Sequence, residues 1–139
     1  MKVTMLLADA AQAVDNKLYI LGGGWSITSP GGTPFGIAIK IEVPWTEADK
    51  RHTWQLRLTD QDGHPFTVEH GAEREPLTIG GGFEVGRPAG LRPGTPIDFT
   101  LAINSAPLPL RPATRYMWRL YINDETADDW FVSFWTRPE

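Results

Sequence analysis

The stretch FGIAIKIEVPW, residues 35–45, decides the fold class. An apolar residue stands at every second position, and the charged residues Lys40 and Glu42 stand between them. The apolar set is Phe35, Ile37, Ile39, Ile41 and Val43. Because successive side chains of a strand point to opposite faces, this alternation predicts a β-strand with one face in a core.

The same period of two recurs in three further stretches, and turn-forming residues separate them. Their apolar faces are Trp54, Leu56 and Leu58; Ile97, Phe99, Leu101 and Ile103; and Tyr116, Trp118, Leu120 and Ile122. No stretch keeps a helical period over three turns, and the one helical turn we expect is residues 46–50, capped by Thr46. We therefore predict one all-β domain over residues 1–139, an antiparallel β-sandwich of about eight strands, with a β-barrel as the alternative. Eight residues are expected to be largely buried: Ile37, Ile39, Trp54, Leu56, Phe99, Leu101, Trp118 and Leu120.

Glycine triplets occur at residues 22–24 and 80–82. A phosphate-binding loop needs a following Lys and Ser or Thr at the start of a helix, and neither triplet has them. Glycine inside a strand more often marks a bend or the close approach of another group. We expect both triplets to lie in strands, where the missing side chains leave room for another group. Trp25 and Phe83 are expected to lie over the neighbouring backbone that glycine leaves uncovered.

Charge and composition exclude several kinds of partner. The 13 basic and 17 acidic residues give a net charge of −4, and no stretch concentrates Lys or Arg. Nucleic-acid affinity requires several phosphate contacts from one basic face, so we expect no nucleic-acid partner. The absence of cysteine excludes disulfides and thiolate chemistry.

The apolar run near the N-terminus, residues 3–8, is short for a signal peptide or a membrane span. We interpret it as the first strand. The expectation is a soluble cytoplasmic protein without a membrane partner.

No metal, cofactor or catalytic residue is expected from local motifs. His52 shares a face with Trp54 and Leu56, which indicates a histidine at the core edge, whereas His64 lies in a turn and His70 among glutamates. None of the three has the spacing of a transition-metal site, and no serine lies in a G-x-S-x-G motif. Loop carboxylates are weak Ca²⁺ candidates, and solvated turns are the favoured interpretation. These candidates are Asp124, Asp128 and Asp129, with Glu125 beside them and Asp60 and Asp62 in another turn.

The two ends of the chain carry a family resemblance. The opening LLADAAQAVDNKLYILGGGW, the stretch TRYMWRLYIN and the closing DWFVSFW resemble small bacterial proteins grouped only as a domain of unknown function. The resemblance covers most of the chain and implies a β-sandwich. It supplies no catalytic residue.

The last strand has aromatic residues on both of its faces, with Trp130 and Phe134 on one and Phe131 and Trp135 on the other. Only one face of a sandwich strand meets the core, so the second face needs a cover. We expect Met117 and Tyr121 of the preceding strand to join Phe131 and Trp135 in an apolar patch that forms an interface. The alternative is that the N-terminal segment or a long loop of the same chain covers this surface.

Three classes of function remain at this point. The leading hypothesis is a non-enzymatic protein-binding or assembly module, with a protein partner or a homo-oligomer. The second is a β-sandwich that binds a ligand such as a sugar through exposed aromatic residues. The third is an enzyme without a recognisable motif.

Overall fold

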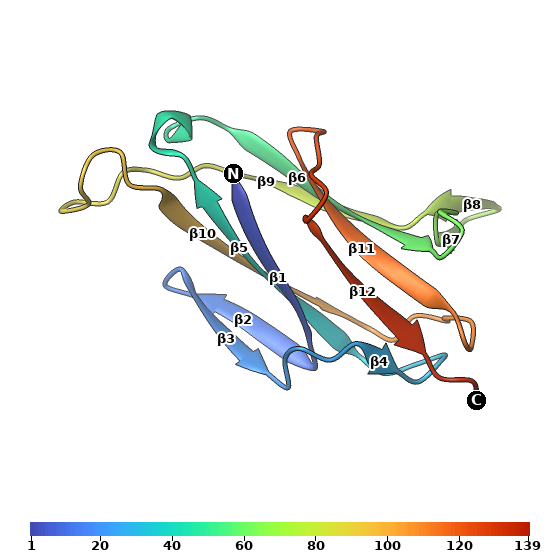
Figure 1. Cartoon of the computed structure of the whole chain (residues 1–139). Coiled ribbons are helices and arrows are strands. Elements are labelled where there is room, and N and C mark those ends of the chain that lie inside the picture. The colour runs from blue at the N-terminus through green and yellow to red at the C-terminus, as the bar shows by residue number, and fades with distance from the viewer.

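In the computed structural model, which describes residues 1–139, two sheets face each other across one hydrophobic core (Figure 1). The smaller sheet has the order β1–β5–β10, formed by Lys2–Ala8, Phe35–Val43 and Ile97–Ser105. The larger sheet has the order β4–β12–β11–β6–β9, formed by Ile27–Thr28, Phe131–Thr136, Arg115–Ile122, His52–Asp60 and Thr78–Phe83. All neighbours are antiparallel except β12 and β4. Neither sheet closes on itself, so the predicted β-sandwich of about eight strands is confirmed.

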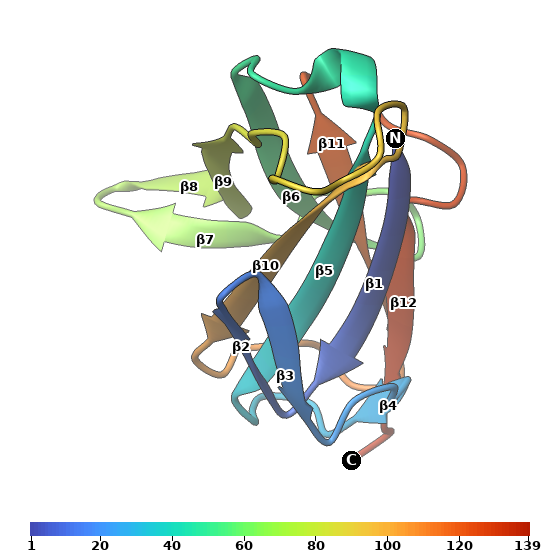
Figure 2. The ribbon, with the colours of Figure 1, turned by 90° about the vertical axis from the view of Figure 1, so that its left-hand side faces the viewer.

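Two small hairpins add four strands that the sequence pattern did not separate. They are β2–β3, formed by Ala10–Val14 and Lys17–Leu21, and β7–β8, formed by Thr67–His70 and Glu73–Pro76. The β7–β8 hairpin projects away from the sandwich (Figure 2). The expected helical turn is a 3-10 turn at Trp45–Glu47, one residue earlier than predicted. The expected cap by Thr46 is wrong, because Pro44 occupies the capping position and Thr46 lies inside the turn.

Strand β5 is covered on both faces. Its alternating apolar residues face the larger sheet and are fully or nearly fully buried. On the other face, the β2–β3 hairpin lies against the smaller sheet (Figure 2). Gly36 permits this approach, because a Cβ there would lie 3.1 Å from the backbone nitrogen of Ala11. Ala38, two residues further on the same face, is also buried.

Two asparagine side chains fix the β2–β3 hairpin. The Asn104 amide accepts a bond from the Ala11 N–H and donates to the Ala11 carbonyl, at 3.0 and 2.8 Å. Asn16 accepts from the N–H of Thr100 and donates to the carbonyl of Asp98, at 2.9 and 2.7 Å. Asn16 therefore takes the place of a neighbouring strand at the free edge of β10.

The core confirms most of the predicted inward positions. Trp54, Leu56, Trp118 and Leu120 are buried, as are Ile37 and Ile39. Phe99 and Leu101 are only partly buried, contrary to the prediction. Both lie on β10, an edge strand whose side chains have a neighbouring strand on one side only. Phe99 is held instead by stacking on Phe83, with ring centroids 4.5 Å apart.

This difference predicts unequal costs for two phenylalanine truncations. Phe134→Ala removes a buried ring and should lower the free energy of unfolding by about 3–5 kcal/mol. Phe99→Ala removes a partly exposed ring and should cost roughly 1.5–3 kcal/mol, because less apolar surface returns to water. Urea unfolding of both variants measures the difference. Equal costs would contradict the assigned edge position of Phe99.

The glycine triplet at residues 80–82 lies in a strand, β9, as predicted. The ring over it is that of Trp54 on the neighbouring strand, and not Phe83, because Phe83 points into the core. A Cβ at Gly81 would lie 3.0 Å from Nε1 of Trp54. The triplet at residues 22–24 does not lie in a strand, so that prediction is wrong: Gly22 and Gly24 have φ of 62° and 92° in the loop after β3.

Gly81 and Gly82 therefore form a matched pair for mutation. Gly81→Ala should lower the free energy of unfolding by about 1–3 kcal/mol, because the buried Trp54 ring must move. The three atoms nearest to a Cβ at Gly82 all belong to the guanidinium of Arg51, the end of a flexible and exposed side chain. Gly82→Ala should thus be much milder. Thermal unfolding of the two variants tests this order, and the reverse order would contradict the role assigned to Trp54.

Candidate functional site

The outer surface of the larger sheet carries an ordered array of arginine and aromatic side chains. Odd-numbered residues of β6, β11 and β12 point outward, because the even-numbered residues of these strands enter the core. We call the surface around Arg57, Arg115 and Arg119 the arginine face. No other strand packs against it (Figure 1).

Strand register decides which outward residues meet. Arg119 on β11 lies directly opposite Arg57 on β6 and directly opposite Phe131 on β12. Arg115 on β11 lies opposite Trp135, and Trp135 in turn lies opposite Ile27 on β4. Like charges directly opposite each other on a sheet are destabilising, so the pair Arg57–Arg119 lowers stability unless something compensates it.

Neutral groups hold each guanidinium of the arginine face in place. Arg57 lies 3.8 Å over the ring of Tyr121 and donates to Gln55. Arg119 lies 5.3 Å from the ring of Phe131 and donates to the carbonyl of Ala127. These aromatic contacts are cation–π interactions, which orient a cation without neutralising its charge. Each guanidinium has five N–H donors, so most of its donors remain free.

No carboxylate neutralises these arginines. None of the seven ion pairs of the structure includes Arg57, Arg115 or Arg119. The guanidinium of Arg51 joins the same surface over Gly82 and is also outside every ion pair. The outward strand positions contain no acidic residue: Ile27, Thr53, Gln55, Arg57, Thr59, Thr78, Gly80, Gly82, Arg115, Met117, Arg119, Tyr121, Phe131, Ser133 and Trp135. Four uncompensated positive charges thus gather on one face of a chain whose net charge is −4.

The sequence did not reveal this basic face, because its arginines are isolated along the chain. The alternation places Arg57 and Arg119 outward, but only the register of β6 against β11 brings them together. No stretch of the sequence concentrates basic residues, but the folded chain brings several of them together on one face. The absence of a nucleic-acid partner stays a prediction.

The residues predicted to form an interface all lie on the outer surface, but not as one apolar patch. Met117 lies opposite Ser133, and Trp135 remains 49% exposed beside Ile27, which is 50% exposed. Tyr121 lies beyond the paired part of β12 and packs under Arg57. Arginine side chains thus separate the predicted apolar residues, since Arg119 lies between Tyr121 and Met117 along β11.

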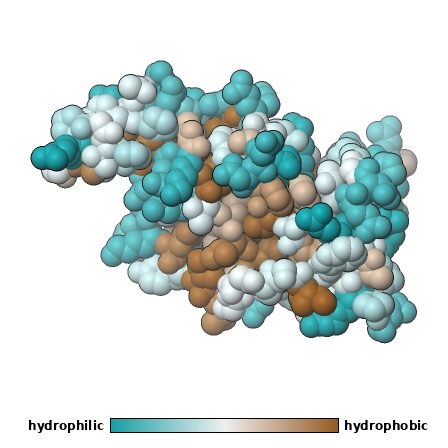
Figure 3. All heavy atoms as spheres, viewed as in Figure 1, coloured by the Kyte–Doolittle hydropathy of each residue, from teal (hydrophilic) through white to brown (hydrophobic).

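The proposed cover from the same chain is not on this surface. The N-terminal hairpin β2–β3 lies on the smaller sheet, at the opposite side of the molecule (Figure 1). Its own outer surface is a second apolar region, visible in Figure 3 as brown atoms over β1 and the hairpin. Its exposed members are Leu6, Val14, Tyr19, Ile20 and Leu21. We call this region the hairpin patch.

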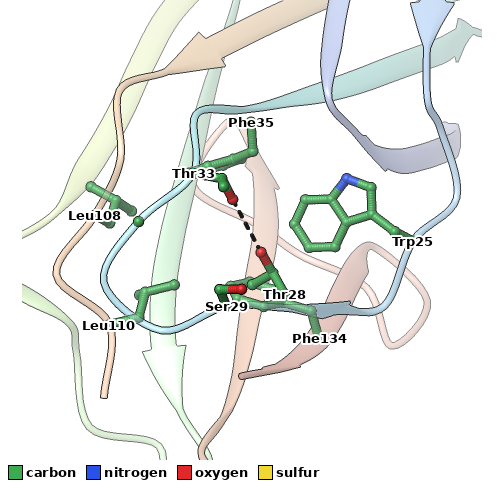
Figure 4. A pocket seen from close by; sticks show the side chains of 9 residues that line it. Trp25, Thr28, Ser29, Thr33, Phe35, Leu108, Leu110 and Phe134 are labelled. Carbon is green, nitrogen blue, oxygen red and sulfur yellow. Dashed lines mark hydrogen bonds between the residues drawn. The ribbon is translucent and has the colours of Figure 1, made fainter. Parts of the chain in front are cut away.

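The enclosed hollows of the protein are poorly suited to a ligand. One between the two sheets is lined by Trp25, Phe35, Leu110 and Phe134, with a contact of 3.3 Å between the hydroxyls of Thr28 and Thr33 (Figure 4). Its volume is about 10 Å³, near the minimum for a single water molecule.

A more open hollow of about 310 Å³ lies beside Asp60 at the base of the β7–β8 hairpin. Its charged residues are Asp60, Arg74 and Arg111. It contains no histidine and only one carboxylate. Its other ionisable residue is Tyr116, whose hydroxyl accepts a bond from the N–H of Arg111.

Asp60 organises the turn between β6 and β7. Its Oδ1 accepts bonds from the N–H groups of Asp62 and His64, and its Oδ2 lies 2.9 Å from the guanidinium of Arg111. Desolvation raises the pKa of Asp60, but these backbone bonds and the nearby charges of His64 and Arg111 outweigh it. The pKa of Asp60 is therefore lowered from the ordinary 3.8.

The lowered pKa predicts a pH-dependent contribution to stability. The ionised form of Asp60 is favoured in the folded state, so its stabilisation is present above pH 3.8 and is lost as the pH falls through the lower folded-state pKa. Asp60→Asn should lower the free energy of unfolding at neutral pH and flatten its decline in acid. Urea unfolding from pH 7 to pH 2.5 measures this change. Asp62→Asn keeps the Asp60 contacts and serves as control; if both variants lose the same acid dependence, Asp60 is not its source.

Of the calcium candidates, the three-dimensional arrangement brings Asp60 and Asp62 together with a third possible ligand. The three ligand groups that converge within 4.8 Å are Asp60, Asp62 and His64, whose two carboxylates and one ring lie in the same turn. Asp124, Asp128 and Asp129 do not form such a group. Asn123 and Asp124 have φ of 52° and 65°, typical of a tight hairpin turn, and Asp124, Asp128 and Asp129 are exposed.

His52 lies at the core edge, as predicted, and is buried. Its Nε2 lies 2.9 Å from the carbonyl of Glu47 and its Nδ1 lies 3.0 Å from the amide nitrogen of Asn123. Because a carbonyl only accepts, these partners assign the neutral tautomer with the proton on Nε2. Asn123 also accepts from the N–H of Thr53, so this network ties β6 to the β11–β12 turn. His52 has a structural role.

The fold and this surface define a β-sandwich protein with an uncovered basic and aromatic sheet face. Residues 3–131 match the family model of DUF6941, a family of unknown function, and the chain belongs to this family. No curated protein and no solved structure matches the chain. The structure contains no helix with the length and apolar character needed to cross a membrane.

Proposed function

We propose that this chain is a non-enzymatic protein-binding module that docks its partner on the arginine face. The observation that carries the proposal is the pair Trp135 and Ile27, which are neighbours on β12 and β4 and are each about half exposed. Exposed large apolar groups beside one another mark interaction surfaces. Trp, Tyr, Met and Arg are also the residue types enriched in interface cores, and this face contains all four.

The architecture supports the same proposal. Side chains on a sheet face are held by the strands on either side, so a partner meets a surface that is already ordered. The contacts of Arg57 and Arg119 with aromatic rings add to this order. The partner is a different protein or a second copy of the chain.

The test compares two double variants on opposite sides of the molecule. Phe131→Ala/Trp135→Ala should weaken the partner complex, or the homo-oligomer, by at least about tenfold, because aromatic anchors dominate interface energies. Tyr19→Ala/Leu21→Ala removes a comparable pair of exposed side chains from the hairpin patch and should leave binding unchanged. Light scattering reports the oligomer, and affinity capture followed by titration reports the partner, with circular dichroism to verify folding.

The proposal has clear contrary outcomes. A wild-type monomer at high concentration that captures no partner would overturn it. Loss of binding in the Tyr19→Ala/Leu21→Ala variant alone would move the interface to the hairpin patch.

A further inference from the structure

We infer that the arginine face recognises an acidic, extended segment of a partner protein. This inference rests on the proposed function and specifies the chemistry of the partner. Its basis is charge complementarity: three arginines and no acidic residue occupy the outward strand positions of one sheet, and the guanidinium of Arg51, just before β6, lies over Gly82 on the same face.

The pair Arg57–Arg119 is the centre of this surface. Two guanidinium groups directly opposite each other on β6 and β11 repel, and no carboxylate of the chain lies within 4.0 Å of either. A carboxylate that bridges the two groups would remove this repulsion and would accept from their free donors. Planar guanidinium groups match the two oxygens of a carboxylate, which makes such bonds among the strongest in proteins.

The spacing of the arginines indicates the length and form of the segment. Arg115 and Arg119 are four residues apart on β11 and face the same side, so about 13 Å separates their positions at the rise of a strand. Carboxylates four residues apart on an extended segment have the same separation. Met117 lies between these arginines and Trp135 lies opposite Arg115, so apolar residues of the segment would also find contacts.

The surroundings favour a short acidic segment over a nucleic acid. The chain has a net charge of −4, and the loop that carries Asp124, Glu125, Asp128 and Asp129 joins β11 to β12 beside this face. A long polyanion would pass from the arginines toward these carboxylates and be repelled. A segment with a few carboxylates contacts the arginines alone.

The experiment uses defined probes and the full chain. A fluorescein-labelled peptide of twelve residues, in which Glu alternates with Val, is titrated with protein and followed by fluorescence anisotropy. The same peptide with Gln in place of Glu tests the requirement for charge, and a twelve-nucleotide strand of thymidine tests nucleic acid. We expect the Glu peptide to bind at least about tenfold more tightly than the Gln peptide, and to weaken with added salt.

Matched variants locate the binding. Arg57→Gln/Arg119→Gln should weaken binding of the Glu peptide by about tenfold or more, because two charged partners are lost. Arg87→Gln/Arg92→Gln changes the net charge equally at exposed positions in the loop between β9 and β10, outside the array, and should alter binding less than about threefold. Circular dichroism verifies that both variants are folded.

Three results would overturn the inference: equal binding of the Glu and Gln peptides, an equal loss in both arginine variants, or tighter binding of the thymidine strand. Its failure is distinguishable from that of the proposed function. A partner complex that is sensitive to Phe131→Ala/Trp135→Ala but insensitive to Arg57→Gln/Arg119→Gln would retain the binding module and reject an acidic partner.

Discussion

Burial of β5 on both faces is the constraint on which the rest of the structure depends. One face presents five apolar residues to the larger sheet, and the other must be thin enough for the β2–β3 hairpin to lie on it. Gly36 has no side chain and Ala38 has only a methyl group, so the hairpin can approach this face closely. The hairpin packs against the smaller sheet, and Asn16 and Asn104 anchor it there. It therefore does not cover the larger sheet. The arginine face is left uncovered as a result.

The alternation of apolar and polar residues predicted the fold, because in a strand it fixes which face lies in the core. The inward residues of β5, β6 and β11 follow from it directly, and the core contains them. Exposure at a sheet edge is a property of strand order, so the partial exposure of Phe99 could not be found in the same way. The two glycine triplets show a similar limit. Identical letters form a strand at residues 80–82, where β6 pairs with them, and a loop at residues 22–24, where positive φ is needed.

The candidate site shows where sequence reasoning ends in this chain. Outward positions of Met117, Tyr121, Phe131 and Trp135 follow from the alternation, but their neighbours follow from register. β6 and β11 are separated by more than fifty residues, and no local signal states that Arg57 meets Arg119. A shift of two residues along β11 would place Met117 or Tyr121 opposite Arg57 and separate the charges. The electrostatic character of the surface is thus determined by one pairing of distant strands.

The β7–β8 hairpin divides the chain into two parts that both contribute to each principal sheet. It projects from the sandwich, and its residues from Glu69 to Pro76 are exposed. A chain break at its tip would leave β1, β5 and β6 on one fragment and β9, β10, β11 and β12 on the other. Each principal sheet then contains strands from both fragments, since β5 pairs with β10 and β6 pairs with β9 and β11. The tip is therefore a natural point for fragment complementation, at which two separately produced pieces can rebuild one sandwich.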